Sequence, residues 1–191
     1  MTKNIRKVSN IRYASIREMD ISNGEGVGVA LFVQGCHFHC YNCFNPDTWD
    51  FNSGKEWTPE IKDKFLELID RPYIKRVSFL GGECLANENL EGVYDVIKDV
   101  KELFPDKKIW MYTGYTWESI FNPIVTDNLD LKRDRLIELR KMIVKMTDIL
   151  IDGQYIHEQR GMNLKFRGSK NQRVIDVKES LKQSKIILYL D

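Results

Sequence analysis

The sequence predicts an α/β protein with a curved, mostly parallel sheet arranged as a partial (β/α) barrel. Strand-like and helix-like segments alternate along the chain, which is typical of parallel strands joined by right-handed helical crossovers. Polar and glycine-containing segments repeatedly follow the strands, where parallel sheets bind their ligands. With 191 residues, the chain is long enough for a sizeable core but shorter than a complete eight-unit barrel.

The first strands come from apolar segments near the N-terminus. Residues 11–16 are expected to form a short leading strand. Residues 27–33 (VGVALFV) form a continuous apolar run, which is typical of a buried strand. The turn-forming segment SNGEG at residues 22–26 introduces this second strand. The chain after residue 33 therefore starts from the C-terminal end of a strand.

The first helix is expected at residues 58–70. Thr58 can cap its N-terminus, and Pro59 suits the first helical position because the missing N–H has no partner there in any case. Four apolar residues share one face of this helix, namely Ile61, Phe65, Leu68 and Ile69. The helix leads to a strand at residues 75–80.

Two further helix and strand units complete the predicted alternation. We expect a helix at residues 89–104, a strand at residues 108–112, a helix at residues 133–146 and a strand at residues 148–151. Pro105 ends the first of these helices because proline cannot continue it. Gly81, Thr113 and Asp152 each follow a strand, so these residues are expected at the same edge of the sheet.

The C-terminal part of the sequence has weaker periodicity. Residues 154–175 are polar, contain glycine and show no clear period, so we expect a loop that is ordered by itself or by a partner. Residues 185–190 (KIILYL) are expected to form a last strand. No internal repeat or linker stands out, so residues 1–191 are predicted to form a single domain.

The charge of the chain is balanced, with 29 lysine and arginine residues against 28 aspartate and glutamate residues. Such a balance gives no overall field that would attract nucleic acid or an anionic membrane, so neither is expected as a partner. The first residues, MTKNIRKVSNIRY, lack the apolar stretch of a secretory signal, and no apolar run of about 18 residues occurs. A cytoplasmic protein is therefore expected.

Three cysteines lie close together in the run QGCHFHCYNCFN, namely Cys36, Cys40 and Cys43. Reducing conditions in the cytoplasm disfavour structural disulfides, and three cysteines leave one unpaired, so metal or redox chemistry is the better interpretation. A 4Fe-4S cluster normally takes four protein thiolates, one for each iron. Three cysteines would leave one iron without a protein ligand and therefore open to a substrate. Catalytic zinc sites differ from structural ones in the same way, because they keep one coordination position free.

A zinc site is the alternative at these cysteines, with His37 or His39 as the fourth ligand. Structural zinc sites usually draw a second ligand pair from further along the chain, and His157 is the only other histidine in the sequence. The cluster is therefore the favoured hypothesis. His37 and His39 are expected in loop or partner contacts.

The combination of Cys36-x3-Cys40-x2-Cys43 with Gly81-Gly82-Glu83 resembles the radical S-adenosylmethionine (SAM) superfamily. Within it, the chain resembles the activating proteins of anaerobic ribonucleoside-triphosphate reductases. The blocks that carry this resemblance are NGEG at 23–26, LFVQGC at 31–36, CFNPDTW at 43–49, TGYTWE at 113–118, LIDG at 150–153 and KFRGSKNQRVID at 165–176. The resemblance implies that the partial barrel is of the radical SAM type.

The resemblance also implies an activity. In this family, SAM binds the open iron through its amino and carboxylate groups, and one electron breaks a carbon-sulfur bond to give methionine and a 5'-deoxyadenosyl radical. This radical takes a hydrogen atom from a glycine of the reductase large subunit, which keeps a glycyl radical. The family further implies an electron donor such as reduced flavodoxin. The protein contributes orientation, electron access and exclusion of oxygen to such chemistry.

Candidate residues follow from the same resemblance. Cys36, Cys40 and Cys43 carry over as the ligands of the 4Fe-4S cluster. The cofactor-binding candidates are Asn42, Phe44, Gly81, Gly82, Glu83 and Thr113. The two glycines allow a ligand to approach the backbone closely, and backbone or carboxylate oxygens can accept hydrogen bonds from the SAM ammonium group. Asn42 and Phe44 are expected beside the open iron, and Thr113 is expected to line the pocket from the next strand.

The chain departs from the superfamily pattern at two positions near these candidates. Asn42 stands where many members have an aromatic residue, so Tyr41 or Phe44 would have to supply the contact with adenine. Cys84 follows Glu83, where proline is common. Its thiol either fills that place as a small, semi-buried side chain or serves as a fourth cluster ligand. With a fourth cysteine ligand, no iron would be open to a substrate, which would favour a role as an electron carrier.

Two other functions stay open as alternatives at this point. The first is a radical SAM enzyme that acts on a small molecule, and the TGYTWE and FRGSKNQR segments are what favour the activating proteins over it. The second is a noncatalytic iron-sulfur or zinc module for electron transfer or interaction. Cys84→Ala separates this second alternative from the activase, because only a cluster with four protein ligands needs that thiol.

Overall fold

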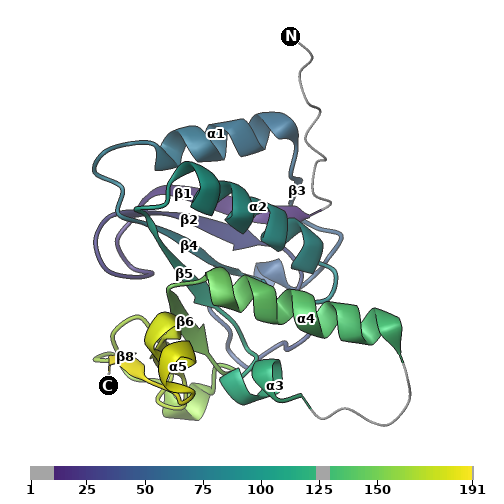
Figure 1. Cartoon of the computed structure of the whole chain (residues 1–191), viewed down its shortest axis with the longest axis vertical. Helices are drawn as coiled ribbons and strands as arrows, with labels where there is room; N and C mark the ends of the chain where they lie inside the picture. The colour runs from purple at the N-terminus through teal and green to yellow at the C-terminus, as the bar shows by residue number, and fades with distance from the viewer. Residues whose placement is uncertain (1–10, 124–129, 191) are drawn as a thin grey trace.

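The computed structural model describes residues 11–123 and 130–190, and a single eight-stranded sheet runs through this part of the chain (Figure 1). The strand order is β3-β1-β2-β4-β5-β6-β7-β8. The strands are β1 (Arg12–Asp20), β2 (Gly28–Val33), β3 (Lys55–Glu56), β4 (Arg76–Gly81), β5 (Lys108–Tyr112), β6 (Ile149–Asp152), β7 (Arg173–Asp176) and β8 (Leu188–Leu190). The expected strands at the N-terminus and in the centre are therefore confirmed, with β1 longer than predicted.

The sheet is mixed, which corrects the prediction of a mostly parallel one. Its centre is parallel, because β2 pairs with β4, β4 with β5 and β5 with β6 in that sense. The outer strands β1, β3, β7 and β8 pair antiparallel with their neighbours. Residues 21–27, which join β1 to β2, are too few for the crossover that parallel strands require. The alternation in the sequence thus predicted the centre of the sheet correctly and its edges wrongly.

In the described residues, three longer helices cover one face of the sheet, and two shorter ones follow β5 and β7 (Figure 1). The helices are α1 (Pro59–Ile69), α2 (Leu90–Leu103), α3 (Trp117–Phe121), α4 (Leu131–Met146) and α5 (Val177–Gln183). The predicted cap of α1 is confirmed, because the Thr58 side chain accepts a hydrogen bond of 3.4 Å from the Ile61 backbone N–H. The short helices α3 and α5 were not predicted. In the described residues, each helix is too short or too polar to form a membrane span.

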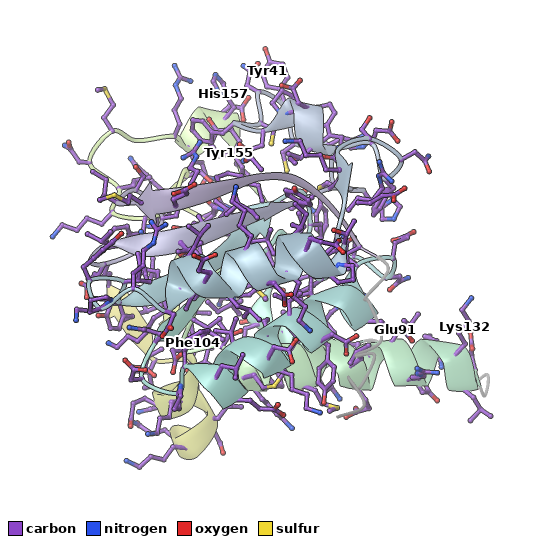
Figure 2. The ribbon with its side chains drawn as sticks, turned by 90° about the horizontal axis from the view of Figure 1, so that it is seen from above. Tyr41, Glu91, Phe104, Lys132, Tyr155 and His157 are labelled. Atoms are coloured by element: carbon purple, nitrogen blue, oxygen red, sulfur yellow. The ribbon has the colours of Figure 1, made fainter. Side chains whose placement is uncertain are left out.

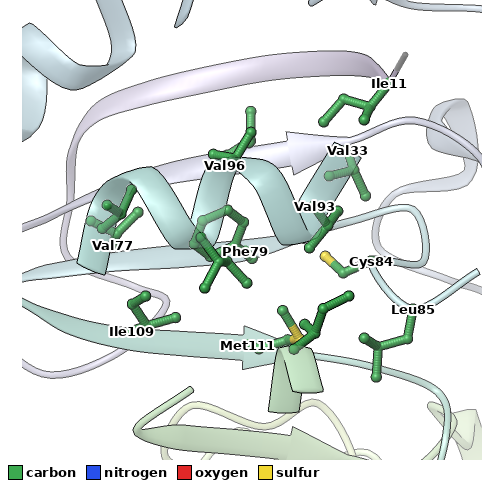
Figure 3. Close-up of a cluster of buried hydrophobic side chains, with 14 of the residues drawn as sticks. Ile11, Val33, Val77, Phe79, Cys84, Leu85, Val93, Val96, Ile109 and Met111 are labelled. Carbon is green, nitrogen blue, oxygen red and sulfur yellow. The ribbon is translucent and has the colours of Figure 1, made fainter. Parts of the chain in front are cut away.

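The main hydrophobic core lies between the sheet and helices α1, α2 and α4. Alternate residues of each strand point to this face, so that Phe79 of β4 and Met111 of β5 lie beside Val93 and Val96 of α2 (Figure 3). The other face of the sheet carries a smaller apolar cluster around Phe32, which belongs to β2. The helices therefore leave this second face available for other parts of the chain.

The segment after β6 is ordered by its own hydrogen bonds. The Gln172 side-chain oxygen accepts hydrogen bonds from the backbone N–H groups of Gly168 (2.8 Å) and Ser169 (3.2 Å). The Ser169 hydroxyl accepts another from the Ile156 N–H (3.1 Å). The expected loop is thus confirmed for most of residues 154–175, and the strand β7 at its end was missed. The predicted last strand is confirmed in a shorter form, β8.

Arg173 of β7 joins α3 to the end of β6. Its guanidinium donates hydrogen bonds to both carboxylate oxygens of Glu118 (2.9 and 2.8 Å) and to Asp152, which is fully buried. Asp152 in turn accepts a hydrogen bond of 2.8 Å from the Trp117 backbone N–H. Asp152 thus lies at the expected edge of the sheet, where it stabilises the fold and does not line the pocket described below.

We expect Glu118→Gln to remove part of the acid sensitivity of the fold. The hydrogen bonds from Arg173 lower the pKa of Glu118 from 4.5 to about 2. A lowered pKa contributes stability above about pH 4.5, and this contribution is lost as the pH falls towards 2. Because the Glu118 side chain is more than half exposed, solvent screening limits the loss in E118Q to about 1 kcal/mol at pH 7.

The measurement is the free energy of unfolding in urea for wild type and E118Q across the acid range. The two curves should converge as the pH falls, because the wild type loses the ion pair that E118Q lacks. Glu102→Gln is the control, since Glu102 is an exposed residue of α2 whose ion pair among the described residues is with Lys98, one turn away. A constant difference between wild type and E118Q down to low pH would contradict the ion-pair contribution.

Candidate functional site

The C-terminal ends of the central parallel strands meet at a pocket of about 560 Å³. The sequence candidates that line it are Cys36, Cys40, Cys43, Phe44, Gly81, Gly82, Glu83 and Thr113. The cysteines follow β2, the glycines and Glu83 come from the end of β4, and Thr113 follows β5. Asn42 is exposed and does not line the pocket; its φ of 52° makes the tight turn between Cys40 and Cys43. The structure therefore brings together every sequence candidate except Asn42.

Backbone hydrogen bonds fix where the cysteine loop leaves β2. Gly35 N–H donates to Thr48 O (2.8 Å), and Cys36 N–H donates to Trp49 O (3.0 Å). These bonds close residues 36–47 into a loop whose two ends lie side by side. The Gln34 side chain strengthens this closure by donating to the carbonyl oxygens of Asp47 and Asp50. The three cysteines are thus presented on a closed loop rather than on a free segment.

The three thiols are partly buried at the pocket, and burial raises the pKa of Cys36 and Cys40 because it disfavours the thiolate. The backbone N–H groups of Phe38 and His39 act in the opposite direction and favour the Cys36 thiolate. Asn45 N–H donates to the Cys43 sulfur at 3.4 Å. A bound metal supplies the positive charge that makes a coordinating thiol a thiolate. The donor set therefore fits an iron-sulfur cluster.

The spacing of these ligands differs from that of a mononuclear site. Among the described residues, no three His, Cys, Asp or Glu side chains are grouped so that they could hold one metal ion. A 4Fe-4S cluster has no such requirement, because each cysteine binds a different iron. Three thiols spread around one pocket are compatible with that arrangement.

Gly81 and Gly82 are required by the packing of two loops. A Cβ on Gly82 would lie only 2.4 Å from the Gly35 backbone oxygen, so no other residue fits there without a shift of the backbone. Glu83 N–H donates a 2.7 Å hydrogen bond to the same Gly35 oxygen, and Gly82 N–H donates to Val33 O at 2.9 Å. We attributed these glycines to the approach of a ligand. The structure adds a second reason, the contact between the β4 end and the start of the cysteine loop.

Glu83 is buried and joins the ends of β4 and β5. One carboxylate oxygen accepts hydrogen bonds from the Leu85 N–H (2.8 Å) and the Thr113 hydroxyl (2.7 Å), and the other accepts one from the Gly114 N–H (2.7 Å). Burial raises the pKa of Glu83, and these three donors oppose that effect because they stabilise the ionised form. The carboxylate thus fixes the loop after β4 and the loop after β5 relative to each other.

Comparison with known proteins identifies the family. The profile described as "4Fe-4S single cluster domain" matches residues 22–175. The chain is 34% identical to the anaerobic ribonucleoside-triphosphate reductase-activating protein of Vibrio cholerae over 164 residues, which is 85% of this chain and 96% of that protein. The chain belongs to this family of activating proteins. The protein of the same name from Escherichia coli K12 is 30% identical over 86% of this chain and 97% of its own length, and that of enterobacteria phage T4 is 32% identical over 86% and 93%.

Cys84 follows the Gly-Gly-Glu segment in this member of the activating-protein family, and its thiol points into the core. The residue is fully buried beside Val33 and Val93, and its sulfur lies 3.9 Å from Leu80 O (Figure 3). Cys84 does not line the pocket that holds the other three cysteines. The structure therefore supports the small core side chain rather than the fourth cluster ligand, although the residue is more deeply buried than expected.

The two histidines of the cysteine loop have partners away from the pocket. The His37 ring packs on Phe51 with 4.5 Å between centroids, and its Nε2 lies 3.0 Å from Glu88. The His39 ring stacks on Trp49 at 4.6 Å. Neither histidine lines the pocket, which agrees with the expectation of loop contacts and gives the zinc alternative no fourth ligand there.

The sequence missed much of the pocket wall of this activating-protein family member. Arg17 lines the pocket with its guanidinium 4.6 Å above the Phe32 ring, and Tyr112 lies at the end of β5, where burial raises its pKa. Further lining residues come from the segment after β6, namely Gly153, Gln154, Tyr155, Leu164, Phe166, Arg167, Gly168 and Gln172. The KFRGSKNQRVID block, which overlaps this segment, was the available signal.

Proposed function

We propose that this chain is an activase that generates a glycyl radical on the large subunit of an anaerobic ribonucleoside-triphosphate reductase, with a 4Fe-4S cluster and SAM as cofactors. The observation that carries the proposal is the meeting of three cysteine thiols with the Gly-Gly-Glu segment at one pocket. Membership in the activating-protein family supports the reductase as the partner.

Cys36, Cys40 and Cys43 would hold three irons of the cluster, and the fourth iron would stay open. When bound, the reduced cluster and SAM would supply the radical chemistry that removes a hydrogen atom from the glycine, with methionine and 5'-deoxyadenosine as the products of SAM. The electron would come from a donor such as reduced flavodoxin. The chain supplies the ligands, and the hard chemistry belongs to the cofactors.

The remaining residues would bind and orient SAM. The backbone of Gly81 and Gly82 lines the pocket and would accept hydrogen bonds from the SAM ammonium group. Glu83 would act through Thr113 and Gly114, because its carboxylate already accepts hydrogen bonds from both. Phe44 would pack on the adenosine end and exclude water from it, while Asn42 would shape the turn beside Cys43.

We further propose that residues 1–191 form one cytoplasmic radical SAM domain with the partial barrel of that superfamily. The parallel centre of the sheet supports this assignment, because the pocket lies at its carboxyl edge. Helices α1, α2 and α4 cover one face of the sheet (Figure 1), and Phe32 and Tyr112 line the pocket from the other face. This arrangement is also compatible with a curved half-barrel.

The first experiment is anaerobic reconstitution with iron and sulfide, followed by electron paramagnetic resonance (EPR) of the reduced protein with and without SAM. We expect a 4Fe-4S signal that changes when SAM is added, because SAM would occupy the open iron. A signal that is indifferent to SAM, or zinc in place of iron, would contradict the activase and favour a noncatalytic module.

A second step identifies the hydrogen donor. The reduced protein is incubated with SAM and the reductase large subunit, and 5'-deoxyadenosine and the glycyl radical are measured together. We expect both to depend on the large subunit and the radical signal to be lost when its glycine is replaced by alanine. Formation of 5'-deoxyadenosine without any radical on the reductase would favour a small-molecule substrate.

A further inference from the structure

Arg17 of β1 places a positive charge at the wall of the pocket. The residue lies opposite Ala30 of β2, three residues before the end of the strand that leads to the cysteines. Its guanidinium lies 4.6 Å above the Phe32 ring, on the face of the sheet that the helices leave open. A cation is attracted to the face of an aromatic ring without using its N–H groups. The five N–H donors of the guanidinium therefore stay available for a ligand.

The acid nearest to Arg17 in the described residues is already engaged elsewhere. Arg17 Nη1 lies 3.8 Å from Asp20 Oδ2, which is too long for a hydrogen bond. The Asp20 carboxylate lies 2.6 Å from the Arg76 guanidinium, in an ion pair whose side chains are each only 1% exposed. It also accepts a hydrogen bond of 2.7 Å from the Asn23 side chain. Asp20 thus neutralises Arg76, while the Arg17 side chain stays 56% exposed.

Two other charged side chains line the pocket, and both serve the fold. The Glu83 carboxylate is buried and accepts the three hydrogen bonds described above. Arg167 donates a hydrogen bond of 3.0 Å to the Gln172 backbone oxygen. The lining therefore presents a free cation at Arg17 and no free anion beside it. This arrangement favours a carboxylate as the ligand, because a guanidinium can bind a carboxylate through two parallel hydrogen bonds.

Two sources of such a carboxylate follow from the proposed function, SAM and the reductase. The SAM carboxylate is expected on the open iron beside the cysteines, whereas Arg17 lies back along β2 from that end of the pocket. Met19 and Ile21 follow Arg17 along the chain, and their side chains are 64% and 72% exposed. The next residue, Ser22, lines the pocket. Exposed apolar surface beside a binding site is typical of contact with another protein, so these observations favour the reductase.

We propose that Arg17 binds a carboxylate of the reductase segment that carries the target glycine, and that it thereby makes the activase specific for an acidic segment. This inference rests on the proposed function. A glycine has no side chain through which it could be recognised, so the residues around it must supply the specific contacts. Arg17 holds the side chain of an aspartate or glutamate in that segment, or the carboxylate of a chain terminus.

The test compares Arg17→Gln with the wild type in the activation of the reductase large subunit. The initial rate of glycyl-radical formation is measured by EPR at saturating SAM and at increasing concentrations of the large subunit. We expect R17Q to raise the KM for the large subunit at least about tenfold, because a hydrogen-bonded charge is lost from the contact. The kcat should stay within about twofold, since Arg17 does not touch the reacting atoms.

The affinity for SAM is measured separately, from the change that SAM causes in the EPR signal of the reduced cluster. We expect R17Q to keep the wild-type affinity. The KM of the wild type for the large subunit should also rise with ionic strength, and more steeply than that of R17Q, because salt screens the contact between Arg17 and the carboxylate.

Two further variants complete the comparison. Arg17→Lys keeps the charge and loses the planar fork, so its KM should lie between those of wild type and R17Q. Arg135→Gln is the matched control, because it removes the same charge from an exposed side chain of α4 that pairs with Glu91 at 2.8 Å. Figure 2 shows Glu91 far from Tyr155, which lines the pocket. R135Q should therefore keep the wild-type KM.

The possible results separate the inference from the proposed function. An unchanged KM of R17Q for the large subunit would overturn the inference while the proposed function stands. Weaker SAM binding in R17Q with an unchanged KM would assign Arg17 to the SAM carboxylate, and a change in kcat alone would assign it to the reaction; either result overturns the inference. If R17Q loads no cluster, R17K and the salt series decide. If the wild type forms no radical on the large subunit, both the proposed function and the inference fail.

Discussion

Replacement of Cys43 by alanine is expected to abolish the 4Fe-4S cluster, whereas replacement of Cys84 by alanine is expected to leave it in place. Cys43 lines the pocket with Cys36 and Cys40, and a cubane held by two thiolates lacks a ligand that the chain cannot replace. Cys84 is fully buried among apolar side chains and does not line the pocket. The two substitutions remove the same atom and differ only in its location.

The measurement is the iron and sulfide content after anaerobic reconstitution, together with the EPR signal of the reduced protein. The iron content, sulfide content and EPR signal of C43A should fall to background. C84A should keep the wild-type iron and sulfide content and the response of its EPR signal to SAM. Because C84A leaves a small cavity in the core, we expect a loss of about 1 kcal/mol in the free energy of unfolding. Loss of the cluster from a folded C84A protein would instead indicate four cysteine ligands.

The contrast between these two cysteines shows what the sequence could predict. The spacing of Cys36, Cys40 and Cys43 is a local feature of the sequence. One predicted strand precedes these cysteines and another precedes the Gly-Gly-Glu segment, so the sequence was enough to place both groups at one edge of the sheet. The direction of the Cys84 side chain depends on the helix α2 that packs above it, and no local pattern contains that information. The sequence therefore left two interpretations, and packing separated them.

The missed features share the same physical origin. The antiparallel pairing of β6 with β7 depends on how the segment between these strands folds. The order of this segment comes from side chains such as Gln172 and Ser169, which have no periodic signature. The packing of the Tyr155 ring on the Phe44 ring joins segments that are far apart in sequence. The regular helices and central strands, by contrast, carry their signal in apolar periodicity and caps, so their boundaries were predicted closely.

Glu83→Gln is expected to weaken both the fold and the binding of SAM. The carboxylate accepts three hydrogen bonds, from the Leu85 N–H, the Thr113 hydroxyl and the Gly114 N–H. Glutamine has one acceptor oxygen, so its NH2 group would face at least one of these donors in either orientation. A buried donor that loses its partner costs about 1–3 kcal/mol, and we expect the free energy of unfolding to fall by about 2 kcal/mol.

The effect on SAM follows from the position of the three donors. They belong to the loops after β4 and β5, and Thr113 and Gly114 both line the pocket. The amide of glutamine would push one of these loops away from the other, so the pocket residues would no longer lie in the arrangement that binds SAM. The affinity for SAM should then fall at least about tenfold, which corresponds to about 1.4 kcal/mol. Urea unfolding and SAM titration of the reconstituted protein measure the two effects separately.

Glu88→Gln is the matched control for this substitution. Glu88 lies a few residues away and undergoes the same chemical change, but its side chain is half exposed and contacts only His37 among the partners described here. Exposed positions of this kind usually alter stability by less than about 0.5 kcal/mol. If E83Q binds SAM as tightly as E88Q while losing stability, the carboxylate serves the fold alone. Loss of both stability and SAM affinity in E83Q would identify the Glu83 carboxylate as the group that holds the pocket residues in their binding geometry.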